Sequence, residues 1–253
     1  MVGMAGVFMM LIDDQGMPFK EYATKKHSDG ITTSCYISSR VGQSFSIEVD
    51  NAVPHDLRRA RDSEYVNFRI FVDGIHVDSQ LCAGRTKELV QGAPTSNGVQ
   101  SRFVFSDLLT STDESMAKRD WSTWDRFGLV EVLVHRVLPH FLYPPPATEP
   151  VFFNGLDTVH RENAYAGRHR TTLGEDVLQP NERCSVTYID PKSAPYAALR
   201  VYYRPPEMLE ARGIISGLSA RTTYDQDSAS ISRDNGLPVK QEHIVHRMSR
   251  LTL

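Results

Sequence analysis

Cysteine is scarce in this chain of 253 residues, which contains 3, namely Cys35, Cys82 and Cys184. An odd number of widely separated cysteines without a CxxC pair argues against a disulfide framework and against a cysteine zinc site. We therefore expect reduced, mostly buried thiols in an intracellular protein, located in the cytoplasm or the nucleus.

The sequence also lacks a hydrophobic run long enough to cross a bilayer. The apolar stretch MVGMAGVFMMLI at the start is followed at once by Asp13 and Asp14, and it is shorter than the ~20 residues that a membrane helix needs. It has neither a basic region nor a small-residue cleavage motif, so it does not resemble a targeting signal. We expect no membrane association, and we predict a buried strand at Val7–Ile12.

Charge of one sign and the common catalytic motifs are missing as well. The net charge is −3, from 28 basic and 31 acidic residues, which indicates neither nucleic acid nor an anionic membrane as a partner. The sequence contains no GxSxG nucleophile elbow, no GxxxxGK[ST] phosphate loop, no GxGxxG and no HExxH. We accordingly predict no catalytic residue, no cofactor and no metal site.

What the chain does contain is a clear β pattern, strongest in YVNFRIFVDGIHV at Tyr65–Val77. Every second residue from Val66 to Val72 is apolar, which is typical of a strand with one buried face. Asp73-Gly74 suits a two-residue type I′ turn, because both residue types tolerate a positive φ. The predicted hairpin pairs Val72 with Ile75 and Ile70 with Val77.

Further stretches of the chain predict additional strands. Leu129–Val137 is apolar on both faces, which is typical of a central strand, whereas the polar, glycine-containing stretch Thr86–Gln100 is expected to be a loop. Pro205-Pro206 is expected to open a short helix that Gly213 ends. The remaining predicted strands are Ile31–Ser38 and Phe45–Val49, taken together as a hairpin over Ile31–Val49, then Arg102–Phe105, Glu182–Ile189 and Ala198–Tyr203.

These elements predict an all-β protein. The expected architecture is an antiparallel β-sandwich of about eight strands, with a jelly-roll arrangement as one possibility, and one short C-terminal helix. We expect this domain to cover residues 1–215. Residues 216–253 are rich in small polar side chains and are expected to form a largely disordered tail, with a possible short helix at 239–251.

A family resemblance adds to this interpretation. The sequence resembles a family of uncharacterised proteins of mushroom-forming (basidiomycete) fungi, built on a β-rich domain of unknown function. The resemblance covers about residues 5–215 and implies a fungal, intracellular protein with a variable polar tail. The family has no assigned activity, so it implies no catalytic residue. The stretches that carry the resemblance are Asp13–Tyr22, Ser34–Val49, Phe68–Gly74, Leu129–Val137, Val159–Glu175 and Leu199–Ile215.

The densest polar cluster lies at His160–Glu162 and Arg168–Arg170. His160, Glu162 and His169 are possible metal ligands, but the neighbouring arginines would repel a cation. Arginine presents a fork of donors to phosphate oxygens, so an anion contact is the more plausible function. The alternative is a solvated hairpin with structural ion pairs, which contribute little individually.

A pair of tryptophans forms the second candidate site. Trp121 and Trp124 lie between Asp120 and Asp125, and tryptophans beside acids suit contacts with carbohydrate or protein. The alternative is that these residues cap one end of the sandwich.

We therefore interpret the chain as a non-enzymatic binding or scaffolding module whose expected partner is another protein. One alternative is a carbohydrate-active or hydrolytic β-sandwich enzyme that uses the tryptophan loop. Another is a binder of nucleic acid or another anion through the arginine clusters. The candidate ligand-binding residues are Arg161, Glu162, Arg168, His169, Arg170, Trp121 and Trp124.

Overall fold

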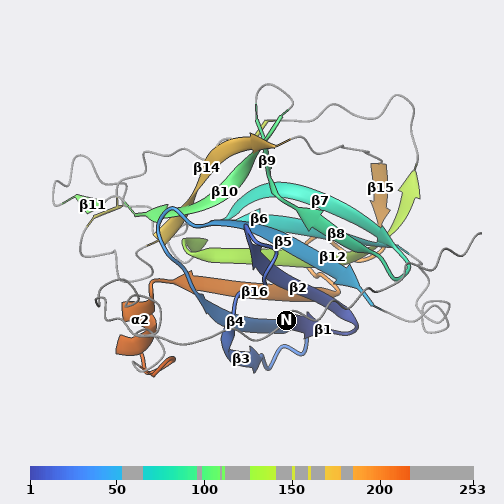
Figure 1. Ribbon diagram of the computed structural model, residues 1–253. Coiled ribbons are helices and arrows are strands. Elements are labelled where there is room, and N and C mark those ends of the chain that lie inside the picture. Colours follow the sequence, from blue (N-terminus) through green and yellow to red (C-terminus); the bar gives the residue numbers. More distant parts are fainter. Residues whose placement is uncertain are drawn as a thin grey trace, which may run out of the picture.

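Two seven-stranded sheets form the protein in a computed structural model (Figure 1). The described residues are 1–52, 65–95, 99–108, 110–111, 126–140, 150–151, 159–160, 169–177 and 185–216. The predicted tail at 216–253 therefore lies outside them beyond its first residue, as does the possible helix at 239–251.

The first sheet has the strand order β1-β2-β5-β10-β14, with β8 paired to β5 and β9 paired to β10. Its neighbouring strands are antiparallel. The strands are β1 (Val2–Met4), β2 (Val7–Asp13), β5 (Ser44–Asn51), β8 (Lys87–Val90), β9 (Gly92–Pro94), β10 (Gln100–Asp107) and β14 (His169–Val177).

The second sheet has the order β3-β4-β16-β12-β6-β7, with β15 paired to β12. A separate parallel pair joins β11 (Thr110–Ser111) to β13 (Val159–His160). The strands of the second sheet are β3 (Glu21–Lys26), β4 (Thr32–Ser38), β6 (Tyr65–Val72), β7 (Ile75–Ala83), β12 (Leu129–His140), β15 (Ser185–Tyr188) and β16 (Ala197–Arg204).

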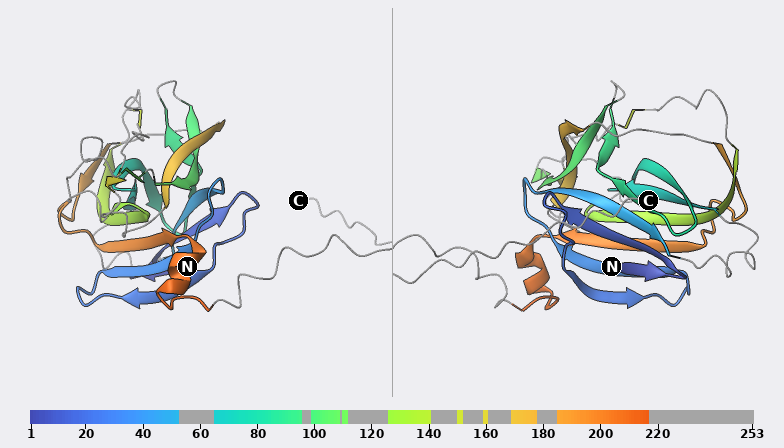
Figure 2. Two further views of the ribbon diagram at one scale, coloured as in Figure 1. Left: turned by 90° about the vertical axis from the view of Figure 1, so that its left-hand side faces the viewer. Right: turned by 45° about the vertical axis from the view of Figure 1, so that its right-hand side comes forward.

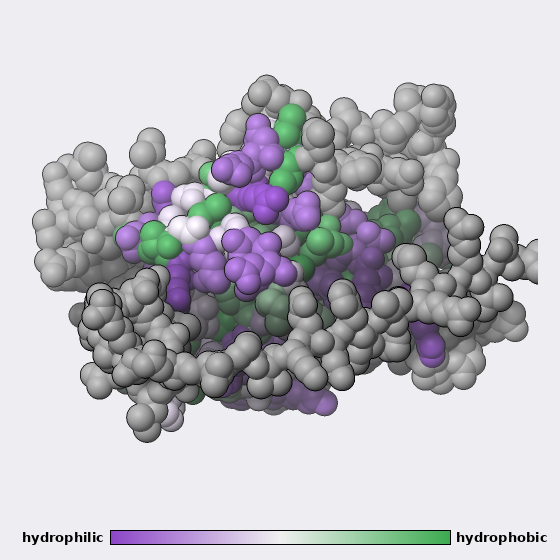
Figure 3. All heavy atoms as spheres, viewed as in Figure 1, coloured by the Kyte–Doolittle hydropathy of each residue, from purple (hydrophilic) through white to green (hydrophobic). Residues whose placement is uncertain are grey.

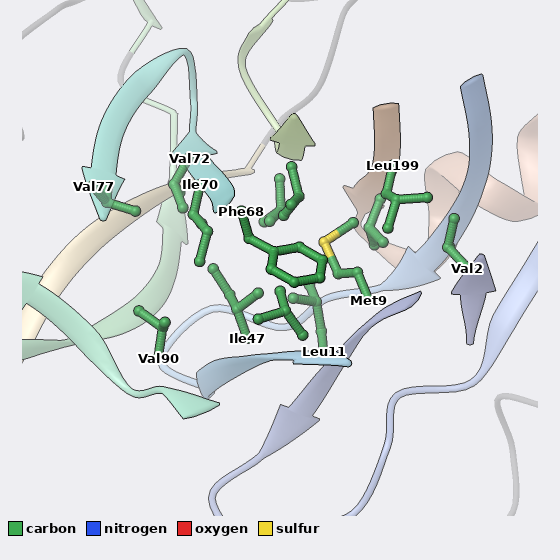
Figure 4. Packing of buried hydrophobic residues seen from close by; sticks show 14 of the residues in the cluster. Val2, Met9, Leu11, Ile47, Phe68, Ile70, Val72, Val77, Val90 and Leu199 are labelled. Atoms are coloured by element: carbon green, nitrogen blue, oxygen red, sulfur yellow. The ribbon is translucent and has the colours of Figure 1, made fainter. Parts of the chain in front are cut away.

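The hydrophobic core lies between the two sheets (Figure 2). Phe68 of β6 points across the core toward Met9, Leu11 and Ile47 of the first sheet (Figure 4), and all of these side chains are buried. The all-β sandwich that the alternating pattern predicts is thus confirmed. The alternation also means that residues between these core positions on each strand point away from the partner sheet.

The hairpin at the end of β6 is confirmed with one change of register. Asp73 has a φ of 51° and Gly74 a φ of 80°, the two positive values of a type I′ turn. Val72 pairs with Ile75 as predicted, but Ile70 pairs with Asp78 because the register shifts between Ile70 and Phe71. The predicted Ile70–Val77 pair is therefore wrong.

Several other predictions about single elements can now be judged. β12 lies between β16 and β6, which confirms that it is a central strand. The short helix is confirmed as α2 (Pro206–Ala211), which follows β16, and Gly213 comes after it with a φ of 66°. Two of the three thiols, Cys35 and Cys82, are buried as expected, and burial raises the pKa of both thiols. Cys184 lies outside the described residues.

The predicted hairpin over Ile31–Val49 is wrong. β4 and β5 belong to different sheets, so the connection between them crosses the sandwich. β4 instead pairs in parallel with β16, which makes the second sheet mixed rather than purely antiparallel. Period-two patterning identifies a strand but carries no information about its partner, and this is why the local sequence suggested a hairpin.

The stretch predicted as the loop Thr86–Gln100 contains the short strands β8 and β9. They are 4 and 3 residues long, with the sequences KELV and GAP, and neither shows the alternation of apolar and polar residues that predicts a strand. Short strands of this kind also explain why the structure contains more strands than the approximately eight that the sequence predicts.

Gly74→Val is expected to destabilise the protein by about 1–3 kcal/mol, because a β-branched residue is strained at positive φ. A Cβ at this position would also meet the Cδ of Arg126 at 2.7 Å. Chemical denaturation measures the effect. Gly42→Val is the control for backbone strain alone, since Gly42 has a φ of 81° with nothing within 4 Å of the added Cβ. Near-wild-type stability of Gly74→Val would contradict the type I′ turn.

Candidate functional site

Of the seven candidate ligand-binding residues, the structure describes His169 and Arg170. Both lie at the start of β14 and are buried, with exposed fractions of 6% and 8%. Their role in ligand binding stays a prediction. The other five lie outside the described residues, namely Trp121, Trp124, Arg161, Glu162 and Arg168.

His169 lies between a serine and an aspartate that the sequence analysis did not single out. Its Nδ1 is 2.8 Å from the Oγ of Ser39, and its Nε2 is 3.9 Å from Oδ1 of Asp107. Burial is the main reason that the pKa of His169 is lowered, against the opposing effect of Asp107. A serine, a histidine and an aspartate are thus brought together from three distant parts of the chain.

This arrangement has the composition of a nucleophilic triad, but its geometry does not suit acyl transfer. A substrate carbonyl must reach the serine oxygen, and Ser39 has an exposed fraction of 0%. The separation of 3.9 Å between His169 and Asp107 exceeds a hydrogen bond, and the Asp107 side chain is 74% exposed. Ser39 also donates its backbone N–H to the carbonyl of Arg204 at 2.9 Å. We interpret the cluster as a structural contact between β14 and the end of β4.

A second polar cluster surrounds the carboxylate of Asp73 in the type I′ turn. The carboxylate accepts hydrogen bonds from the backbone N–H groups of Gly128 and Thr171, both at 2.7 Å, and from the hydroxyl of Tyr203 at 2.5 Å. Burial raises the pKa of Asp73 to about 6, although these donors act in the opposite direction. This carboxylate joins the β6–β7 turn to β14 of the other sheet, to β16 and to the residue before β12.

Arg204, at the end of β16, completes this junction. Its Nη1 donates to the carbonyl oxygens of Gly128 at 2.6 Å and Tyr203 at 2.8 Å. Burial lowers the pKa of its guanidinium group. A Cβ on Gly128 would lie 2.1 Å from that Nη1, so the close approach requires glycine. Since its donors face backbone carbonyls, Arg204 acts as a structural residue.

The outer face of the second sheet presents a different kind of surface. Tyr22, Tyr36 and Tyr202 occupy one row across β3, β4 and β16. In a neighbouring row, Arg200 is opposite Glu131, and Glu131 is opposite Phe71 of β6. On β4, β16, β12 and β6 these residues alternate with buried core positions, so they point outward, and Tyr22 lies on the same side because it pairs with Tyr36.

Aromatic rings and cations are paired on this outer face. The cationic groups lie over the rings at 5.2 Å for Lys20 and Tyr22, 5.1 Å for Arg69 and Phe71, and 5.1 Å for Lys192 and Tyr188. These distances are in the range of cation–π contacts. We name this surface the aromatic–basic face, defined as Lys20, Tyr22, Lys25, Tyr36, Arg69, Phe71, Tyr188, Lys192, Arg200 and Tyr202.

The charge of the aromatic–basic face is positive. The carboxylate in its central row, Glu131, is already paired with Arg200, whose Nε lies 2.7 Å from Oε1 of Glu131. Lys20, Lys25 and Lys192 are exposed, and Arg69 is half-buried. The face therefore offers cationic donors and half-buried rings to a ligand.

Neither a metal site nor a broad apolar surface occurs in the part of the chain that the structure describes. No group of three or more histidine, cysteine, aspartate or glutamate side chains there is placed to hold a metal ion. The exposed large hydrophobic residues there are scattered, and in the view of Figure 3 small hydrophobic areas alternate with hydrophilic ones. The described helix is neither long nor apolar enough to span a bilayer.

Comparison with known proteins identifies the family but no function. Searches of curated proteins and of solved structures found no match. A family model described as a domain of unknown function (DUF7918) matches residues 10–217, which include nearly all of the described strands and α2. The chain therefore belongs to the DUF7918 family of domains of unknown function.

Proposed function

We propose that this protein is a non-enzymatic binding module that takes an anionic ligand on the aromatic–basic face. The observation that carries this proposal is the pairing of rings and cations on one outer sheet face, with three cation–ring contacts at 5.1 to 5.2 Å. Lysine and arginine side chains are donors only, so they require a ligand that supplies acceptors.

Two further observations support binding rather than catalysis. Ser39, the serine placed beside a histidine, has an exposed fraction of 0%. The half-buried Asp73 accepts three hydrogen bonds from its own chain through its carboxylate. Both groups are therefore committed to holding the fold together.

The chemistry of the surface also favours an anion over an apolar protein partner. Exposed large hydrophobic side chains in the described ranges are Met1, Met17, Val41 and Leu138, which lie apart in the fold. Single exposed apolar residues are normal on any protein surface and do not mark an interface. We further propose that the protein is fungal and intracellular, as the family resemblance of its sequence implies.

Retention on heparin tests the proposal. The face variant replaces Lys25, Arg69 and Lys192 with glutamine. The matched control replaces Arg85, Lys87 and Arg102 with glutamine, so both variants lose three positive charges. Arg85 precedes β8, Lys87 is in β8 and Arg102 is in β10 of the other sheet. We expect wild type and control to bind at low salt and to elute together, and the face variant to elute at clearly lower salt, because phosphate- or sulfate-like contacts are electrostatic.

Two outcomes would contradict the proposal. One is a wild-type protein that heparin does not retain at low salt, and the other is identical elution of the two triple variants. A further variant, Arg161→Gln with Arg168→Gln, tests on the same column the anion contact predicted from the sequence. Loss of retention in that variant alone would move the ligand site from the aromatic–basic face to this cluster.

A further inference from the structure

The aromatic–basic face is organised in rows that cross neighbouring strands. The rings of Tyr36 and Tyr202 are stacked, with centroids 5.3 Å apart and an angle of 29° between their planes. Tyr22 continues the same row on β3. Tyr36 and Tyr202 therefore cover one ring face of each other, and all three rings are half-buried, which leaves part of each ring open to a ligand.

Positively charged side chains lie beside aromatic rings on other strands of the same face. Arg69 lies over Phe71 on β6, and Lys192 lies over Tyr188 at the other end of the sheet. Arg200 has a side chain that is 35% exposed and shares its row with Phe71. Half-buried rings and positive charges therefore occur together on β3, β4, β16 and β6, while Asn67 and His135, on the same side of the sheet toward Tyr188, are buried.

A carbohydrate or a compact anion would use only half of this surface. A neutral sugar could pack on the rings and bond to the tyrosine hydroxyls, but it carries no negative charge to pair with the exposed Lys20, Lys25 and Lys192. A small anion would contact the cations but leave the rings without a role. A polymer with negative charges and planar groups would use both, because bases stack on aromatic rings while phosphates contact lysine and arginine.

We propose that the ligand of the aromatic–basic face is single-stranded nucleic acid, an inference that rests on the proposed function. In a duplex the bases are stacked on one another and unavailable to the tyrosine and phenylalanine rings, whereas a single strand can place them on the sheet. Stacking on aromatic side chains is tolerant of sequence, so the binding has little sequence specificity.

The test uses the full chain and fluorescently labelled oligo(dT) and oligo(U) of about 12 nucleotides, a length within the known site sizes of single-strand binders. Phe71→Leu removes the flat ring but keeps an apolar side chain on β6. Phe8→Leu is the matched control, because Phe8 is also a half-buried phenylalanine but lies in β2 of the other sheet. Thermal melts of both variants verify that they are folded.

We expect wild type and Phe8→Leu to bind both oligonucleotides with the same affinity. Phe71→Leu is expected to bind them about tenfold more weakly, the loss that corresponds to one stacked base. Its retention on heparin should not change, since heparin is a polyanion without bases. Arg69→Gln should in addition reduce the slope of log affinity against log salt by about 0.7, the value for one phosphate contact on a single strand.

Other outcomes separate this inference from the proposed function. Face-dependent heparin binding without binding to either oligonucleotide, or with equal oligonucleotide affinity of Phe71→Leu and wild type, would overturn the single-strand inference and leave the anion-binding proposal standing. Tighter binding to an acidic peptide such as poly-glutamate than to the oligonucleotides would overturn it in favour of a protein partner. Binding to none of these probes would overturn both.

Discussion

Replacing Phe68 by alanine is expected to lower the free energy of unfolding by about 3–5 kcal/mol. Phe68 is fully buried in β6, and its ring contacts the core formed by both sheets (Figure 4). The alanine would leave a cavity at the centre of the sandwich, which backbone hydrogen bonds on both sides of β6 prevent from collapsing. Urea denaturation of the two proteins measures the difference.

The same strand supplies the matched control. Phe71 lies three residues further along β6, is half-buried and faces outward beside Arg69. Phe71→Ala should therefore cost about 1 kcal/mol or less, as for other partly exposed positions. Equal losses for the two variants would mean that Phe71 is not on an open face, which would also remove the basis of the proposed ligand site.

The sequence predicts the strands of this protein well where each strand buries one face. The alternation from Val66 to Val72 and the Asp73-Gly74 turn predict the β6–β7 hairpin, and the apolar residues on both sides of Leu129–Val137 predict a central strand. These features are local, because they depend on the period of a strand and on the φ values that a turn requires.

The assembly of the strands into sheets could not be predicted from local sequence patterns. β4 and β5 are consecutive in the chain but lie in different sheets, and β4 pairs with β16, which is more than 150 residues away in the sequence. One register shift after Ile70 changes the partner of a whole segment of β7. Which strands pair with each other depends on the packing of the complete core, and this cannot be predicted from any single stretch of the sequence.

The candidate site could be predicted only in part for the same reason. Tyr22, Tyr36 and Tyr202 become neighbours through the pairing of β3, β4 and β16. Cations do stand close to two of these tyrosines in the sequence, with Lys20 before Tyr22 and Arg200 before Tyr202, but the sequence analysis did not single them out. Interleaved rings and cations are the signal for nucleic-acid binding. Each cation–ring pair here is only two to four residues apart in the sequence, whereas the gathering of these pairs on one face depends on strand pairing.

Asp73 gives the second large expected effect, which is a dependence of stability on pH. Burial raises its pKa from the usual 3.8 to about 6 in the folded protein. Between these two values the folded protein holds a proton on Asp73 that the unfolded chain releases. The contribution of Asp73 to stability is therefore full below about pH 4 and is lost as the pH rises through about 6, by about 2–3 kcal/mol in total.

Aspartates with lowered pKa values change stability in the opposite direction, so the measurement needs a variant that isolates Asp73. Hydrogen bonds from Thr32 are the main cause of the lowered pKa of Asp29, and Arg136 keeps the pKa of Asp190 low in spite of burial. Stability from these groups is lost as the pH falls through their folded pKa values.

Asp73→Asn keeps the shape of the side chain and its tolerance of positive φ but does not titrate, while Asp29→Asn is a control at an exposed aspartate that also accepts three hydrogen bonds. The difference in unfolding free energy between wild type and Asp73→Asn should change by about 2–3 kcal/mol from pH 4 to pH 7, with wild type becoming relatively less stable at the higher pH. For Asp29→Asn the difference should change in the opposite direction, with wild type becoming relatively more stable as the pH rises from 4, because the pKa of Asp29 is lowered in the folded protein. A constant difference for Asp73→Asn would mean that the hydrogen bonds from Tyr203, Thr171 and Gly128 outweigh the burial of the Asp73 carboxylate.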